Sequence, residues 1–174
     1  MPIAISENEL LADLNGWYQA EAHLIDRACN LTGGGWEQWA TVQFLFWQLT
    51  HRGAQAPSYK REYIAPPFPK RAFDIAYNMP TEVLVDSRHP LILTQWKALR
   101  DGNAASTGAN TDIGTLQEIG QELGKTIPTY PLLVILSPQD VGFKGSGVVG
   151  PLTPGGVRLY VSSAATFQGS WKPS

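Results

Sequence analysis

The apolar run at residues 131–137, PLLVILS, constrains the fold of this chain more than any other stretch. A strand with one face in water alternates apolar and polar side chains, and this run does not. It is therefore typical of a central strand that is covered on both faces. A helix at about residues 112–125, with Leu116 and Ile119 on one face, leads into it. A buried strand that follows an amphipathic helix favours a sheet flanked by helices.

The N-terminal part, residues 7–53, has the pattern of helices. Ser6 and Glu9 match a capping box, and apolar residues then recur at helical spacing. These signals predict one helix over about residues 7–30. The glycines at 33–35 end it, and the second helix that follows is apolar on nearly every side, as in a helix that is buried on several faces.

The sheet-containing part is expected to span residues 59–165. In it, β-branched and aromatic residues alternate with other residues between turn formers, which is the signature of short strands. Strands are predicted at residues 59–65, 71–77, 82–88, 130–137 and 157–164. The fold class is therefore α/β (α+β), with a mixed central sheet of about five strands flanked by helices. All 174 residues are expected to form a single domain, 1–174.

Three connecting segments have weaker patterns. Residues 91–102 fit either the start of a helix or an extended arm. Residues 101–110, DGNAASTGAN, are small and polar and are expected to form a mobile loop. The glycine-rich residues 141–156 lack the spacing of a phosphate-binding loop and are expected to form a long hairpin loop.

Charge and cysteine content limit the classes of function. The net charge is −2 and the pI is about 5.9, so the protein has no global attraction for nucleic acid and any phosphate binding must be local. The single cysteine, Cys29, excludes an internal disulfide and fits a reducing compartment. The sequence contains neither an apolar run long enough for a membrane span nor the features of a signal peptide. We therefore expect a cytoplasmic protein with no membrane partner.

The candidate site combines residues from two of the predicted strands. Because side chains alternate across a strand, Asp86 and Arg88 project to the same side, and pairing of the strands would bring Asp74 beside them. Two carboxylates suit Mg²⁺ (or Mn²⁺), since Mg²⁺ takes one or two carboxylates together with water and phosphate oxygens. An ordinary cross-strand ion pair between Asp74 and Arg88 is the alternative.

The order of KRAFDIAY, DSR, a helix, PLLVILSP and VRLYVSS resembles the core of the PD-(D/E)XK nuclease superfamily, which has the restriction-endonuclease-like fold. The resemblance covers roughly residues 36–162. It implies an Asp on one strand and an acid, any residue and a lysine on the next. Asp74 would be the first acid, Asp86 the second, and Arg88 would take the place of the lysine. A Glu from a preceding helix is also implied, with Glu37 and Glu21 as candidates.

The activity that this resemblance implies is metal-dependent hydrolysis of phosphodiester bonds in DNA or RNA. Asp74 and Asp86 would hold Mg²⁺ or Mn²⁺. Arginine stays protonated where a buried lysine can lose its proton, so Arg88 departs from the family pattern, and Lys70 or Lys97 could replace the missing lysine.

Two other functions remain open from the sequence. The departure at Arg88 also suits a non-cutting member that binds a protein partner, in the manner of an immunity or antitoxin protein, or that forms a homodimer. The third alternative is an enzyme for small molecules, with a pocket under the glycine-rich loop at residues 141–156.

Overall fold

The computed structural model describes residues 2–31, 36–65, 68, 71–99, 102–138, 147–148 and 153–163. The elements follow one another along the chain as α1 (Glu7–Ala20), α2 (Ala22–Leu31), α3 (Trp36–Arg52), η1 (Gly53–Gln55), β1 (Tyr59–Ile64), β2 (Ala72–Tyr77), β3 (Leu91–Ala98), α4 (Gly102–Gly124), β4 (Thr129–Ser137), β5 (Gly147–Val148) and β6 (Arg158–Ser163). None of the described helices is both long enough and apolar enough to cross a lipid bilayer.

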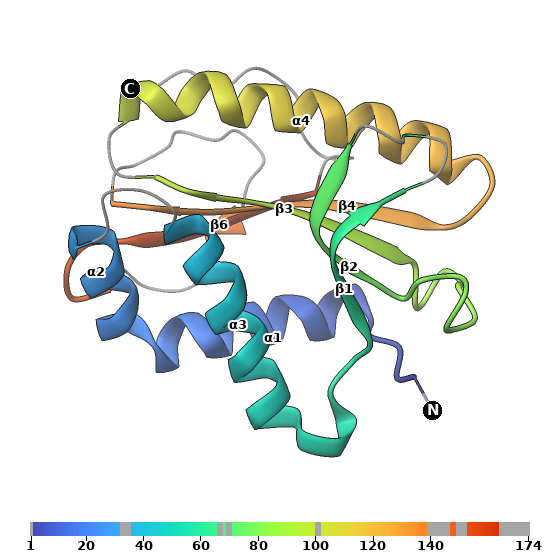
Figure 1. Cartoon of the computed structure of the whole chain (residues 1–174), viewed down its shortest axis with the longest axis horizontal. Coiled ribbons are helices and arrows are strands. Elements are labelled where there is room, and N and C mark those ends of the chain that lie inside the picture. The colour runs from blue at the N-terminus through green and yellow to red at the C-terminus, as the bar shows by residue number, and fades with distance from the viewer. Residues whose placement is uncertain are drawn as a thin grey trace.

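The strands form one six-stranded mixed sheet in the order β1-β2-β3-β4-β6-β5. Strands β3 and β4 are parallel and are connected by α4, whereas the other neighbours are antiparallel. Figure 1 shows α4 on one face of the sheet and α1, α2 and α3 on the other. The predicted α+β class, with a mixed sheet flanked by helices, is therefore confirmed.

Strand β4 is the central strand that the apolar run predicts. Its residues 131–137 are all buried. Leu132 and Val134 belong to the core under α1, α2 and α3, while Leu133 and Ile135 belong to the core under α4. Consecutive residues thus pack into opposite cores, which is why this strand has no polar alternation.

The prediction of one helix over residues 7–30 is wrong, because the chain forms two helices that meet at Glu21. The break redirects α2 so that the carboxylate of Asp26 is buried. This carboxylate accepts hydrogen bonds from the hydroxyl of Thr153 and, at 2.6 Å, from the amide of Gly155. Such contacts come from the far end of the chain, so the local helical spacing could not reveal them.

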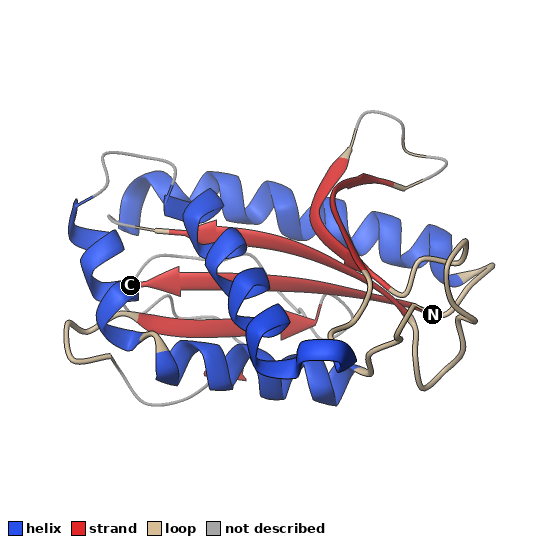
Figure 2. Ribbon diagram, turned by 60° about the horizontal axis from the view of Figure 1, so that its bottom comes forward, coloured by secondary structure: helices blue, strands red, loops and turns tan. Residues whose placement is uncertain are grey.

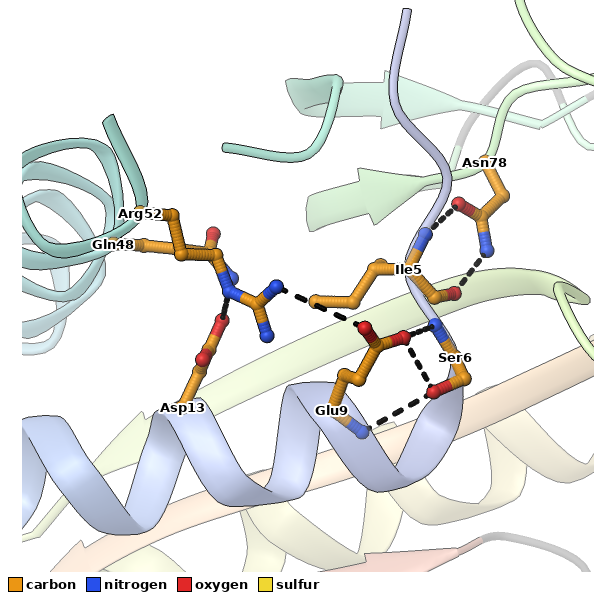
Figure 3. Close-up of polar contacts among 7 residues, drawn as sticks. All are labelled: Ile5, Ser6, Glu9, Asp13, Gln48, Arg52 and Asn78. Atoms are coloured by element: carbon orange, nitrogen blue, oxygen red, sulfur yellow. Dashed lines mark hydrogen bonds and ion pairs between the residues drawn. The ribbon is translucent and has the colours of Figure 1, made fainter. Parts of the chain in front are cut away.

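Polar contacts attach α1 to α3 (Figure 3). Asp13 Oδ2 accepts hydrogen bonds from Gln48 Nε2 at 2.7 Å and from Arg52 Nε at 2.6 Å. Gln48 Oε1 in turn accepts one from the Tyr77 hydroxyl at 3.1 Å. The Oδ2 atom of this buried carboxylate therefore has two donors, which offset the cost of removing it from water.

The end of β2 is attached to the N-terminal segment. Asn78 has a positive φ of 56°, and its side-chain amide accepts a hydrogen bond from Ile5 N at 2.9 Å and donates one to Ile5 O at 2.7 Å. Directly after Ile5, Ser6 and Glu9 form the predicted capping box at the start of α1. Figure 3 shows both sets of contacts.

The predicted strand at residues 82–88 is not formed. Its residues make turns instead, and the Asp86 carboxylate accepts hydrogen bonds from the amides of Arg88 at 2.8 Å and His89 at 2.7 Å. An aspartate that binds nearby backbone amides offers the chain an alternative to strand pairing. The strand next to β2 is β3, so the extended alternative for residues 91–102 holds.

Helix α4 begins at Gly102, so the mobile loop expected at 101–110 is helical from residue 102 onward. A parallel connection must bring the chain back along the length of the sheet. A nine-residue strand spans about 30 Å, and a 23-residue helix spans about 35 Å, whereas a helix of residues 112–125 would reach only about 21 Å. The crossover therefore overrides the weak helix propensity of this segment.

The glycine-rich residues 141–156 lie mostly outside the described residues. The hairpin loop predicted there, and the pocket for a small molecule beneath it, fall on that part of the chain. Within it, β5 pairs antiparallel with β6 at the end of the sheet.

Candidate functional site

The candidate site lies where the β1-β2 hairpin is distorted. Glu62 of β1 has a positive φ of 50°, which residues with a side chain rarely adopt. Asp74 of β2 lies across from it, next to the pair formed by Arg61 and Ile75. Figure 2 shows the hairpin bending away from the rest of the sheet. The bend leaves Asp74 at the point where β2 parts from the sheet.

The side chain of Asp74 provides a hydrogen bond to β3 beyond the point where the backbone pairing of β2 and β3 ends. Strands β2 and β3 pair as far as Ile75 opposite Thr94. The next available amide of β3, Trp96 N, donates a hydrogen bond to Asp74 Oδ2 at 2.7 Å. A carboxylate thus serves as the acceptor for a strand amide and is held beside β3.

Strand β3 brings two further polar residues to this place. Trp96 is buried and packs on Phe44 of α3, with ring centroids 5.4 Å apart. Because side chains alternate, the flanking residues Gln95 and Lys97 lie on the face of β3 opposite to Trp96. Both are half-buried, so neither is an ordinary surface residue.

Lys97 is held between carboxylates from two helices. Its Nζ lies 3.0 Å from Asp112 Oδ2 of α4 and 3.5 Å from Glu37 Oε2 at the start of α3. These helices cover opposite faces of the sheet (Figure 1). Lys97 therefore reaches both because β2 has moved away from β3 at this position.

Burial dominates the electrostatics of the two acids. It raises the pKa of Asp74, although the hydrogen bond from the Trp96 amide and the charge of Lys97 oppose the shift. It also raises the pKa of Glu37, opposed by the charge of Lys97 and reinforced by that of Asp74. Both carboxylates thus carry a negative charge that their surroundings compensate only in part, which is a common property of functional sites.

Lys97 remains a cation in this environment. Burial by itself would lower its pKa, but the hydrogen bond to Asp112 and the charges of Glu37, Asp112 and Asp74 outweigh burial and raise the pKa above its usual value. Lys97 is therefore suited to neutralise negative charge and is unsuited to act as a base near neutral pH.

A hollow of about 160 Å³ opens beside the two acids. It is lined by Glu37, Gln38, Thr41, Arg61, Glu62 and Asp74. Pockets for whole small molecules usually measure about 300–1,000 Å³, and a water molecule takes about 30 Å³. The hollow therefore suits one phosphate group with a few waters better than a complete nucleotide.

The structure does not bring Asp86 or Arg88 to Asp74. Both lie in the turn before β3, whereas Asp74 contacts Trp96, five residues beyond the start of β3 at Leu91 and about 16 Å along the strand. The charges that act on Asp74 come from other residues. Hydrogen bonds from the amides of His89 and Arg88 lower the pKa of Asp86, as in an exposed turn. The expected metal pair of Asp74 and Asp86 is therefore not assembled.

The two glutamates that were expected to support the site differ in position. Glu37 lines the hollow beside Asp74 and contacts Lys97. Glu21 lies at the junction of α1 and α2, where it ends α1, and none of the described contacts around Asp74 involves it. Lys70, considered as a replacement lysine, lies outside the described residues.

Sequence reasoning missed Gln95 and Asp112 and considered Lys97 only as a substitute. The signal for Gln95 and Lys97 was the stretch LILTQWKA, in which these two polar residues flank Trp96 with the period of a strand. Residues 91–102 fit either the start of a helix or an extended arm, and this ambiguity concealed the strand pattern. Asp112 carried no comparable signal, because its place depends on how α4 packs on the sheet.

The donor set fits a hard divalent cation that binds with the help of water. Within the described ranges, no three His, Cys, Asp or Glu side chains gather closely enough to hold a metal ion alone. Mg²⁺, however, is usually bound by one or two carboxylates and keeps water or phosphate oxygens as further ligands. Asp74 and Glu37, which both line the hollow, meet this requirement.

Comparison with known proteins finds no matching family model, no matching curated protein and no matching solved structure. No relative therefore supplies a function or a set of site residues for this chain.

Proposed function

We propose that this protein is a metal-dependent nuclease of the PD-(D/E)XK type, with Asp74, Gln95, Lys97 and Glu37 as its site. The observation that carries the proposal is that Asp74 of β2 accepts a hydrogen bond from the amide of Trp96 on β3, next to Lys97. The charge of Lys97 acts on Asp74, and Lys97 Nζ lies 3.5 Å from Oε2 of Glu37 on the preceding helix. The family pattern likewise has an Asp on one strand, a lysine on the next and a Glu on a preceding helix. Gln95-Trp96-Lys97 then replaces the DSR segment as the second motif, with an amide in place of the acid.

The order of the elements supports the same assignment. The family core has a mixed sheet flanked by helices, with the acids on successive strands. Here α3 precedes β1, β2 and β3, and α4 connects β3 to the parallel strand β4. The restriction-endonuclease-like fold is therefore part of the proposal, and its motif strands are β2 and β3.

Asp74 and Glu37 would hold Mg²⁺ or Mn²⁺. When bound, such an ion polarises a phosphate and lowers the pKa of a bound water. Lys97, a cation between Glu37 and Asp112, would stabilise the negative charge that grows on the phosphate oxygens as water adds to phosphorus and the P–O bond breaks. Trp96 fixes the position of Asp74 through its amide.

The test is cleavage of plasmid DNA and of a labelled RNA in Mg²⁺ or Mn²⁺. We expect Asp74→Asn and Lys97→Met to abolish cleavage. Asp86→Asn is the matched control, because it removes an aspartate that the sequence favoured and the structure leaves outside the site. The nuclease assignment is wrong if wild type cuts neither nucleic acid with either metal. The site assignment is wrong if Asp86→Asn abolishes cleavage and Asp74→Asn does not.

A second function, a non-cutting module that binds a protein, is favoured by one surface of α3. Val42, Phe46 and Leu49 are exposed and lie at helical spacing on one face, and 65% of Phe46 is accessible. Exposed apolar stripes often bind other proteins, including a second copy. The Phe46→Ser variant tests this function, because it should release a co-purifying partner or separate a homodimer while any cleavage activity stays unchanged.

We place the protein in the cytoplasm, with DNA or RNA as its partner. The sole cysteine, Cys29, is buried on α2 and cannot form an internal disulfide, in keeping with a reducing compartment. The small net negative charge means that nucleic acid must be bound through local contacts.

A further inference from the structure

The hollow beside Asp74 contains one cation that the proposed site does not use. Arg61 of β1 lines this hollow together with Glu37 and Asp74. Its side chain is exposed, and its positive charge acts on the Asp74 carboxylate. We propose that Arg61 binds a backbone phosphate of the nucleic-acid strand, next to the phosphodiester held at Asp74. This inference rests on the proposed nuclease function.

The register of the β1-β2 hairpin places Arg61 on the face of the sheet that carries α3, where the hollow opens. Arg61 is paired with Ile75, and directly opposed residues of an antiparallel pair point to the same face. Ile75 belongs to the core under α1, α2 and α3, so Arg61 lies on the side of α3. Gln38 and Thr41 of α3 line the hollow with it.

Arg61 is also available to bind a ligand. The other two arginines close to the hairpin and α3 are engaged, Arg52 with Asp13 and Arg71 with Glu118, each at 2.6 Å. Among the described side chains, no carboxylate lies within ion-pair distance of Arg61. The guanidinium group can therefore present two parallel N–H donors to a phosphate, which is the pairing that favours arginine over lysine.

Glu62 is the group that opposes this role. It follows Arg61 in the chain and lines the same hollow, and its carboxylate repels a phosphate. Water screens its charge because the side chain is exposed. Apart from Arg61, the charged residues that line the hollow are all acidic: Glu37, Glu62 and Asp74. Arg61 is thus the residue that makes the hollow acceptable to a phosphate.

Binding can be separated from cleavage with Asp74→Asn as the background, in the full chain. Fluorescence anisotropy would follow a labelled single-stranded DNA and an RNA of the same sequence over a range of salt concentrations. We expect Arg61→Ala to weaken binding about tenfold and to reduce the salt dependence by about one phosphate contact. Arg61→Lys should restore part of the affinity, because it keeps the charge but loses the paired donors. We expect the preferred substrate to be the nucleic acid, DNA or RNA, whose affinity falls more in Arg61→Ala.

Lys60→Ala is the matched control. Lys60 is the preceding residue of β1, is also exposed and has the same charge, but it is paired with Ala76 and so lies on the other side of the strand. With Asp74 intact, Arg61→Ala should raise KM and leave kcat unchanged. Equal losses in Arg61→Ala and Lys60→Ala would overturn the role of Arg61, while cleavage by wild type would leave the nuclease function standing. A wild-type protein that neither binds nor cuts would overturn both.

Discussion

Lys97 of β3 and Asp112 of α4 form an ion pair with 3.0 Å between Nζ and Oδ2. The pair joins the sheet to its crossover helix, and both side chains are mostly buried. Asp112 thus holds the ammonium group of Lys97 in place.

Asp112→Asn is expected to lower the pKa of Lys97. The hydrogen bond to Asp112 and its charge both raise that pKa, so their loss lets burial dominate and the lysine deprotonates at lower pH. NMR titration of protein labelled with ¹³C-lysine measures this directly, without any activity. Glu122→Gln, which removes the partner of exposed Lys125, should leave the Lys97 signal unchanged. A Lys97 pKa that stays the same in Asp112→Asn would contradict the positioning role.

Asp74→Asn is expected to stabilise the fold at neutral pH by about 1 kcal/mol, as often happens when a functional group is removed. The folded pKa of Asp74 lies above the usual value of 3.8, so ionisation weakens the fold as pH rises from 3.8 through the folded pKa. The variant and wild type should therefore unfold alike in acid and separate as pH rises. Urea unfolding at several pH values measures the difference.

Asp86→Asn is the control, because the pKa of Asp86 is shifted in the opposite direction to that of Asp74. Backbone hydrogen bonds lower the pKa of Asp86, so its stabilising effect is present above the unfolded pKa and is lost as pH falls through the folded pKa. The variant should not gain stability at neutral pH. A gain equal to that of Asp74→Asn would mean that burial of Asp74 is not the cause.

Mg²⁺ is expected to bind wild type and to raise its melting temperature. At a concentration one hundred times Kd, binding adds about 2.7 kcal/mol to the free energy of unfolding. Calorimetric titration should show that Asp74→Asn abolishes binding and that Glu37→Gln weakens it, because these residues supply the two carboxylates. Asp86→Asn should bind like wild type. If only Asp86→Asn lost Mg²⁺ binding, the metal site would lie in the turn before β3 and our assignment to Asp74 and Glu37 would be wrong.

Asp13→Ala is expected to destabilise the protein by about 2 kcal/mol, because it removes charged hydrogen bonds to Gln48 and Arg52 and leaves both without their acceptor. Thermal or urea unfolding measures the loss. Glu118→Ala breaks the ion pair with Arg71, which has the same 2.6 Å separation but lies on the surface, and should cost well under 1 kcal/mol. Equal costs would show that burial does not determine the strength of these pairs.

Most of the fold could be predicted from local patterns. The apolar run of β4, the capping box at Ser6 and the strand patterns of β1, β2 and β6 each describe a segment by its own residues. Two of the errors arose where distant contacts decide the structure. Examples are the helix break at Glu21, where Asp26 reaches Gly155, and the length of α4, which follows from the distance between parallel strands.

The candidate site was only half predictable. Asp74 lies on a strand of correct extent, and Glu37 was chosen from its helix. Asp86 was chosen because residues 82–88 alternate like a strand, but its side chain binds the amides of its own turn. Because of that competition between a short polar side chain and strand pairing, the strand next to β2 is β3, and the site that we propose uses Gln95 and Lys97 of β3 in place of Asp86 and Arg88.

The positive φ of Glu62 has a consequence for association between molecules. Strand β1 is the edge of the sheet, and an exposed edge can add a strand from another copy. Lys60, Arg61 and Glu62 place three consecutive charges on this edge, and the backbone distortion interrupts its row of donors and acceptors. The bend that creates the hollow thus also protects the protein against sheet-to-sheet aggregation.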